Sequence, residues 1–304
     1  MIKQTLYFGN PAYLRVQREQ LCIEVPATGK KIQKPIEDIG IIILDHPQIT
    51  LTQTVLARML ENNVALITCD AKHHPIGLML NLAGHTLQSQ KFRSQIEATL
   101  PLKKQLWQQT IEAKVRNQAS VLAEFELNSN YLFELAKKVK SGDPDNIEAT
   151  AANYYWKQLF AENKSFVRNR FGPPPNHMLN YGYAILRAVV ARNLVGSGLL
   201  PTLGIFHRNQ YNAYCLADDI MEPYRPYVDR FVLSQDQVYL EEDELTPEIK
   251  KLLLQIPAID VLIQDKISPL MVAVQRTTAS LVKCFEGKEK KLVYPQLEPA
   301  CSTA

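Results

Sequence analysis

The first eighty residues alternate between short apolar-rich runs and polar or turn-forming positions. The runs TLYF, AYLRVQ, QLCIEV, KKIQKPI and DIGIIIL are rich in β-branched and aromatic residues, and Gly, Pro or charged residues separate them. Residues 39–44 form a continuous apolar run, which predicts a central strand. One helix interrupts the strands, because Val55, Leu56, Met59 and Leu60 recur at helical spacing. The pattern therefore predicts a mostly β N-terminal region.

After about residue 80 the apolar positions follow a helical period. The long segment PLKKQLWQQTIEAKVRNQASVLAEF is amphipathic, and Pro101 suits the first turn of its helix. Further helices are expected in segments up to about residue 287, and the last residues contain two prolines and no period. We predict an α+β fold in which a β-rich N-terminal domain precedes a larger all-helical domain. The expected bounds are 1–75 for the β domain, 76–90 for a linker, 91–293 for the helical domain and 294–304 for a loose tail.

Composition favours a globular protein with a sizeable core. The chain has 304 residues, 46% of them hydrophobic, and no apolar run reaches transmembrane length. The N-terminus lacks the apolar stretch of a signal peptide, so we expect a cytoplasmic protein without membrane association. The five cysteines are odd in number and form no CxxC pair, which predicts reduced thiols rather than a zinc site or disulfide framework.

Positive charge is unevenly distributed, although the net charge is only +3. Residues 91–208 contain 16 Lys and Arg against 9 Asp and Glu. This local excess favours a polyanionic partner, and ordinary solvated helix faces are the open alternative. No P-loop, GxGxxG or GxSxG motif occurs, so nucleotide hydrolysis, dinucleotide redox chemistry and serine esterase activity have no support.

The segment 204–226 concentrates the chemically useful side chains. It holds one histidine, three carboxylates and two arginines. Asp218 and Glu222 are four residues apart, so a helix places them on one face, where two like charges need a compensating cation. Arg225 or a bound metal would supply it, and His207 with polar neighbours suits the edge of such a site. The alternative is a frayed acidic helix end.

Two other segments extend this candidate site. Glu148 follows a helix-start sequence at residues 143–146, where an acid commonly complements the helix dipole. Because the later segment 204–226 supplies a histidine and further carboxylates, Glu148 is a candidate metal ligand. Arg168 and Arg170, just before FGPPPNH, are placed to grip phosphates, and a solvated loop is the alternative.

These segments resemble the CRISPR-associated integrase family of the adaptation stage, the "Cas-one" family, and most closely its type II branch. The resemblance is carried by IEATAANYYW around Glu148, by PPPNHMLNYGYAILRA, and by GLLPTLGIFHRNQYNAYCLADDIMEPYRPYVD. It covers nearly the whole chain and includes the β-to-α order. It implies an N-terminal β-sandwich-like domain that dimerises and a helical catalytic domain.

The resemblance also implies a site. Members of this family bind Mg²⁺ or Mn²⁺ through residues that match Glu148, His207 and Glu222. Asp218 matches an acid that assists near the site, and Asp219 is a less certain match. Asn153 departs from the family, in which a basic residue is frequent, so a DNA contact there is in doubt. Four arginines are expected to contact DNA, and two of them, Arg208 and Arg225, to neutralise charge in the transition state; the four are Arg168, Arg170, Arg208 and Arg225.

The implied activity is metal-dependent DNA integration and cleavage. The 3′-hydroxyl of a captured DNA duplex would attack a repeat phosphodiester at the leader end of the CRISPR array. The implied partners are this prespacer DNA, the leader-repeat DNA, a second copy of the chain, a small "Cas-two" dimer that bridges two homodimers, and in type II systems the effector nuclease. Two alternatives stay open: a general metal-dependent DNA repair nuclease, and a non-catalytic DNA-binding scaffold.

Overall fold

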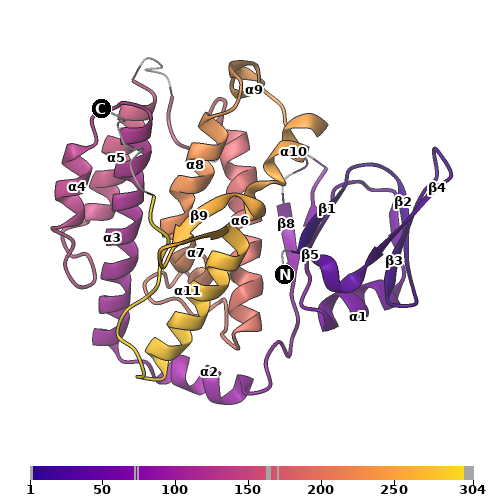
Figure 1. The fold of residues 1–304 in the computed structure, drawn as a ribbon, viewed down its shortest axis with the longest axis horizontal. Helices are drawn as coiled ribbons and strands as arrows, with labels where there is room; N and C mark the ends of the chain where they lie inside the picture. Colours follow the sequence, from indigo (N-terminus) through magenta and orange to yellow (C-terminus); the bar gives the residue numbers. More distant parts are fainter. Residues whose placement is uncertain (1–2, 72, 74, 162–165, 170, 298–304) are drawn as a thin grey trace.

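The computed structural model describes residues 3–71, 73, 75–161, 166–169 and 171–297. In Figure 1 the β-rich N-terminal part lies to one side of a larger helical part. The chain is therefore an α+β protein with the predicted order of its two parts. Within the described ranges, no helix combines the length and the apolar character needed to cross a membrane.

Two four-stranded sheets build the N-terminal part. One has the order β1-β5-β7-β8 and the other β4-β3-β2-β6. The predicted central strand, β5, is buried and lies parallel to both β1 and β7, as expected for a continuous apolar run. A separate hydrophobic core that includes Leu21, Ile42 and Met59 fills this part. The elements are β1 (Gln4–Phe8), β2 (Ala12–Gln17), β3 (Gln20–Val25), β4 (Lys30–Pro35), η1 (Ile36–Asp38), β5 (Ile39–Leu44), β6 (Ile49–Leu51), α1 (Gln53–Glu61), β7 (Ala65–Cys69) and β8 (Pro75–Met79).

Strand β8 corrects the predicted domain boundary. It pairs antiparallel with β7 through Met79, so residues 76–79 belong to the sheet and not to a linker. The sequence analysis missed it because Pro75 and Gly77 read as turn residues, whereas a sheet edge tolerates both.

The helical part is organised around two long buried helices, α3 and α6. Thr99 caps α3 by accepting a hydrogen bond from the Leu102 amide, and Pro101 occupies the first turn as predicted. Gly182 lets α6 approach its neighbours, because a Cβ there would lie 2.7 Å from a methyl group of Val228. The helices are α2 (Gln88–Glu97), α3 (Leu100–Glu124), α4 (Asn130–Ala136), α5 (Ile147–Leu159), α6 (Asn176–Gly196), α7 (Cys215–Met221), η2 (Glu222–Tyr224), α8 (Arg225–Leu233), α9 (Gln237–Glu241), α10 (Pro247–Leu253), η3 (Ile256–Ala258) and α11 (Leu270–Phe285).

The C-terminal region differs from the prediction in two places. A hairpin of β9 (Asp260–Ile263) and β10 (Lys266–Pro269) adds a small sheet to the helical part, and α11 begins only after Pro269. Residues 294–297 are not loose: the Gln296 amide donates to the Leu262 carbonyl, and the Leu297 amide to Asn117 Oδ1. Buried polar partners fix this stretch, and a sequence without periodicity does not reveal them.

Candidate active site

Four segments that are distant in the sequence meet at the candidate site. They are α3, the start of α5, the loop before α7, and the junction of α7, η2 and α8. Helix α3 packs against α5, η2 and α8, and α6 packs against α7 and α8. The long helices α3 and α6 therefore form a frame, and the predicted ligands Glu148, His207 and Glu222 lie on the segments packed beside it.

Glu148 is held at the start of α5 by the segment that precedes it. The Asp143 carboxylate accepts hydrogen bonds from the amides of Ile147 at 2.8 Å and Glu148 at 3.0 Å. This capping satisfies amides that the helix leaves unpaired. It leaves the Glu148 side chain available to point towards α3.

Lys114, on α3, lies between two carboxylates. Its ammonium is 2.7 Å from Glu148 Oε1 and 2.6 Å from Glu222 Oε2. Lysine is rarely this buried without a partner. Burial opposes its charge, but the attraction of Glu222 and Glu148 outweighs burial and raises the pKa of Lys114. The two predicted ligands thus converge on one cation, which the protein itself supplies.

Glu222 is the most enclosed of the predicted ligands. Its residue is 4% exposed, and Arg225 Nε lies 3.0 Å from Oε1. Burial favours the protonated acid, but Arg225 and Lys114 together hold the pKa of Glu222 below its ordinary value. Oε2 is buried and has no well-aligned hydrogen-bond donor among the described residues. Its contact with Lys114 is close but poorly directed, so this oxygen keeps a free lone pair.

His207 is oriented by Asp219. Its Nδ1 lies 2.5 Å from Asp219 Oδ1, and the same carboxylate accepts bonds from the amides of Ile205 at 2.7 Å and Phe206 at 3.0 Å. The hydrogen bond to Asp219 raises the pKa of His207 against the effect of burial, and Glu222 and Glu148 contribute in the same direction. Because Nδ1 is engaged, Nε2 is the nitrogen left for a ligand.

An aromatic stack fixes the loop that carries His207. The rings of Trp107 and Phe206 are parallel with centroids 4.2 Å apart, and the His207 ring meets Trp107 edge-on. Trp107 is buried on α3, on the same face of the helix as Lys114. One helix therefore positions both the histidine loop and the lysine.

Asp218 lies close by but has different partners from those expected of a ligand. Its Oδ1 is 2.6 Å from Arg187 Nε, and its Oδ2 accepts a bond from Asn212 Nδ2 at 2.7 Å. It therefore secures Arg187 and the loop before α7. Of the two adjacent aspartates, the one that contacts His207 is Asp219.

The donor set fits a divalent metal, although the described residues contain no ready-made group of three His, Cys, Asp or Glu side chains around one point. Two carboxylates and one imidazole are ligands that suit Mg²⁺ or Mn²⁺. The buried Oε2 of Glu222 lacks an aligned donor, as an oxygen meant for a cation would. The ammonium of Lys114 lies between the two carboxylates.

A cavity of about 890 Å³ adjoins the Lys114 cluster. Trp156 and Tyr183 line it with four cationic side chains, namely Lys114, Arg168, Arg187 and Arg225. Arg168 is held in place by Asn176 Oδ1 at 2.9 Å and Asn180 Oδ1 at 2.8 Å. The lining also includes the acids Asp70 and Asp229, so basic side chains outnumber acidic ones, and the partly aromatic wall suits a phosphate-bearing chain.

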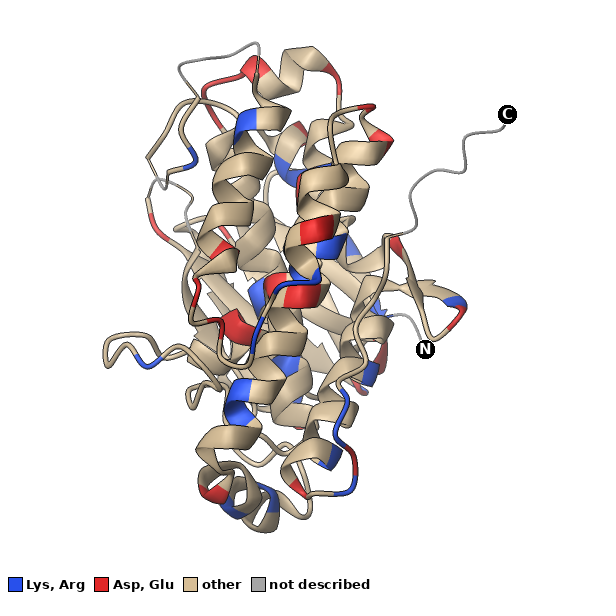
Figure 2. Ribbon diagram, turned by 90° about the vertical axis from the view of Figure 1, so that its left-hand side faces the viewer, with Lys and Arg blue, Asp and Glu red and all other residues tan. Residues whose placement is uncertain are grey.

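The predicted DNA-contacting arginines divide accordingly. Arg168 and Arg225 line this cavity, Arg208 is exposed beside His207, and Arg170 lies outside the described residues. Figure 2 shows basic and acidic positions interleaved along the helices that face the viewer. On that side the positive charge does not form one broad basic face, so the cavity is the more specific candidate for an anion.

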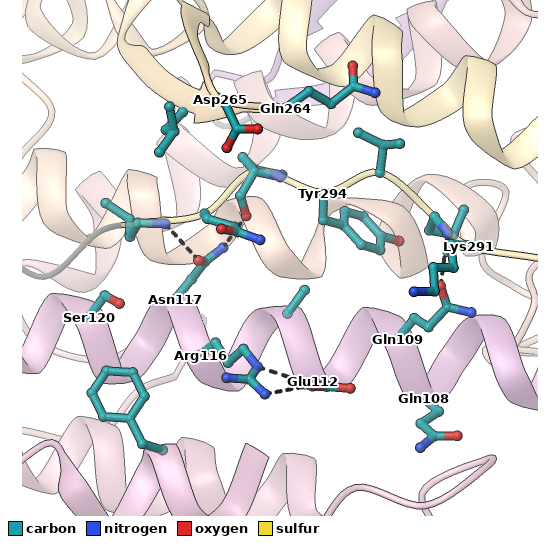
Figure 3. A pocket seen from close by; sticks show the side chains of 18 of the residues that line it. Gln108, Gln109, Glu112, Arg116, Asn117, Ser120, Gln264, Asp265, Lys291 and Tyr294 are labelled. Atoms are coloured by element: carbon teal, nitrogen blue, oxygen red, sulfur yellow. Dashed lines mark hydrogen bonds and ion pairs between the residues drawn. The ribbon is translucent and has the colours of Figure 1, made fainter. Parts of the chain in front are cut away.

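A second cavity, of about 1060 Å³, contains none of the predicted site residues. Figure 3 shows it between α3 and the C-terminal stretch, where Glu112 and Arg116 pair and Asn117 bonds to that stretch. Its lining is mostly amides and apolar groups. Size alone therefore does not identify the site.

The sequence analysis missed two residues of the site, Lys114 and Arg187. Lys114 falls in the buried stripe of α3, at helical spacing from Trp107 and Ile111. A lysine inside an apolar stripe was the available signal. Arg187 gave no comparable signal, because its position on α6 reads as an ordinary helix surface.

The chain resembles known proteins in sequence and in fold. The family model described as "CRISPR associated protein Cas1" matches residues 6–264. The CRISPR-associated endonuclease Cas1 of Neisseria meningitidis serogroup C is 36% identical over 98% of this chain and 98% of its own length. A Cas1 of Pyrobaculum aerophilum is 24% identical over 90% of this chain and 96% of its own length.

Solved structures show the same fold. A casposase bound to integration product superposes with a TM-score of 0.79 at 21% identity, covering 96% of this chain and 92% of that one. A Cas1 protein from Thermotoga maritima gives a TM-score of 0.74 at 15% identity, covering 94% and 98%. The α+β architecture is thus the one these proteins share. The chain belongs to the Cas1 family.

Proposed function

We propose that this protein is a metal-dependent DNA integrase and endonuclease of CRISPR adaptation, which inserts captured DNA into the array by transesterification. One observation carries the proposal: Glu148 and Glu222, from different helices, converge on a single buried cation beside a cationic cavity. Family membership, and a relative over the whole chain that is named an endonuclease, support it.

Glu148, Glu222 and His207 Nε2 would hold Mg²⁺ or Mn²⁺. When bound, the metal would polarise a phosphoryl oxygen and favour the ionised form of the attacking 3′-hydroxyl. Asp219 keeps the imidazole in the orientation and tautomer that present Nε2. Arg225 keeps Glu222 ionised and adds positive charge near the reacting phosphate. Water in place of the hydroxyl would give hydrolysis, so the same residues support cleavage.

The DNA would enter along the cavity. Arg168 and Arg187 line its wall and are positioned by side-chain partners, so they can meet backbone phosphates without large rearrangement. Trp156 and Tyr183 offer faces on which an unpaired base could stack. The exposed Arg208 would contact DNA at the His207 edge of the site.

We propose DNA, Cas2 and a second copy of the chain as partners. Among similar solved structures, one is titled a Cas6-RT-Cas1–Cas2 complex and another a Cas1–DNA complex. The half-exposed Tyr13 on β2 offers apolar surface for a homodimer through residues 1–75. The type II branch and its effector nuclease stay predictions. A monomer mass by light scattering at micromolar concentration would contradict the dimer.

Strand transfer tests the proposed reaction. A 3′-hydroxyl duplex and a leader-repeat target are incubated with the protein, with its Cas2, and with Mn²⁺, Mg²⁺ or a chelator. We expect joined product only with metal. Cleavage without joining would indicate a repair nuclease, and binding without either reaction would indicate a scaffold.

A further inference from the structure

The buried ammonium of Lys114 occupies the place where the two carboxylates point. We propose that Lys114 is an internal cation that competes with the divalent metal for Glu148 and Glu222, so that it stabilises the metal-free protein and weakens metal binding. This inference rests on the proposed function. It adds that the ammonium of Lys114 must leave the metal site before a divalent metal can bind.

Two neighbouring carboxylates cannot both stay ionised in a buried site without a cation. Lys114 provides that charge, with its ammonium 2.7 Å from Glu148 and 2.6 Å from Glu222. A metal held by the same two carboxylates would lie in the same space. The two cations repel each other, so only one of them can occupy the position.

Lys114 satisfies the hydrogen-bonding capacity of the two carboxylates only in part. It donates an aligned hydrogen bond to Glu148, whereas Glu222 Oε2 receives only a close, poorly directed contact. Arg225 Nε lies 3.0 Å from the other oxygen, Oε1, as an ion pair without an aligned hydrogen bond, and its charge helps to keep Glu222 ionised. The arrangement therefore keeps Glu222 ionised and positioned while leaving Oε2 for exchange.

The structure also gives Lys114 a place to go. Its neighbours Ile111 and Val115 are fully buried, so the backbone of α3 is fixed. The four-carbon stem is flexible, and Lys114 already lines the 890 Å³ cavity. Rotation of this stem would bring the ammonium into the cavity, where phosphates of bound DNA would compensate its charge.

The test compares Lys114→Gln with Arg116→Gln, which removes an equal charge from an exposed pair on the same helix. Two quantities are measured without DNA. One is the melting temperature, and the other is the Mn²⁺ affinity from calorimetric titration. We expect Lys114→Gln to melt lower without metal, to bind Mn²⁺ about tenfold more tightly, and to gain more stability from saturating Mn²⁺ than the wild type. Arg116→Gln should change none of these.

Lys114→Arg gives an independent measurement if Lys114→Gln does not fold. A guanidinium can bridge both carboxylates through two directed bonds, so Mn²⁺ should bind more weakly than in the wild type. Equal or weaker Mn²⁺ binding by folded Lys114→Gln, or unchanged binding by Lys114→Arg, would overturn the inference. Metal-dependent strand transfer by the wild type is measured in a separate experiment. Failure of the proposed function can therefore be distinguished from failure of this inference.

Discussion

Two buried lysines in this molecule have opposite surroundings. Lys250 on α10 meets Asp45, at the end of β5, with Nζ 2.8 Å from Oδ2. The Tyr7 hydroxyl donates to the same oxygen at 2.6 Å, and His73 Nδ1 lies 2.8 Å from Oδ1. One carboxylate here serves three donors. At Lys114, one ammonium serves two carboxylates.

This difference separates a structural pair from an exchangeable one. Burial disfavours the charged form of Asp45, but its three donors outweigh burial and lower its pKa. Each of its oxygens is satisfied, and the pair joins the N-terminal sheet to the helical part. The carboxylates around Lys114 instead have too few directed donors, and this is the arrangement that a metal would complete.

The largest expected effect comes from removing the three proposed metal ligands, two of which contact Lys114. Glu148→Ala, His207→Ala and Glu222→Ala should each reduce strand transfer about 1000-fold, because a metal stabilises developing charge by several kcal/mol. Rates of joining with Mn²⁺ check this. Glu112→Ala, which removes an exposed acid from α3, is the control. A folded variant with normal metal-stimulated joining would remove that residue from the site.

Breaking the structural pair should affect stability instead. Asp45→Asn leaves the Lys250 ammonium buried without its counter-charge, and we expect a loss of about 3 kcal/mol in the free energy of unfolding. Urea denaturation measures it. The double variant Asp45→Asn with Lys250→Met should recover part of the loss, since no charge stays buried. Stability within about 0.5 kcal/mol of the wild type for Asp45→Asn would show that the junction does not depend on this pair.

His207 should make metal binding dependent on pH. Its pKa is raised above the ordinary value, so its protonated form stabilises the metal-free fold below pH 6.5, and this stability is lost as the pH rises through the raised pKa. A metal needs the neutral imidazole, so affinity should increase over the same window.

Asp219→Asn tests the source of that shift. The variant keeps the size of the side chain but loses the charge that holds the imidazolium, so the pH window should move down. Mn²⁺ affinity at high pH should fall about 10- to 100-fold, as is typical when the partner of a metal-bound histidine is lost. Titrations across the pH range provide both readouts. An unchanged pH window would show that Asp219 acts only by accepting hydrogen bonds from backbone amides.

Local patterns predicted much of the architecture. The apolar run of β5, the proline in the first turn of α3, and the helix start before Glu148 each follow from short-range rules, and the structure confirms them. The hairpin β9–β10 was missed because its sequence continues into a helical pattern. What fixes it is pairing with a distant C-terminal stretch, through the bond from Gln296 to Leu262.

The site was predictable only in part. Residue types identified Glu148, His207 and Glu222 as candidates, and the resemblance named their role. Asp218 and Asp219 are adjacent, so a helix points them in directions roughly 100° apart. Which of them faces His207 depends on how the loop before α7 returns, and spacing does not reveal this.

The smallest expected effect concerns cations of the cavity that DNA can reach. Arg187 is more accessible than Lys114 and is held by a single carboxylate, Asp218. If its guanidinium meets one backbone phosphate, Arg187→Gln should weaken DNA binding and reduce the log–log salt slope by about 0.9. Fluorescence anisotropy with a short duplex at several salt concentrations measures the slope. Arg58→Gln, in an exposed pair on α1, should leave it unchanged. An unaltered slope for Arg187→Gln would place the DNA path outside this cavity, and the contrast between the two lysines would then concern the metal alone.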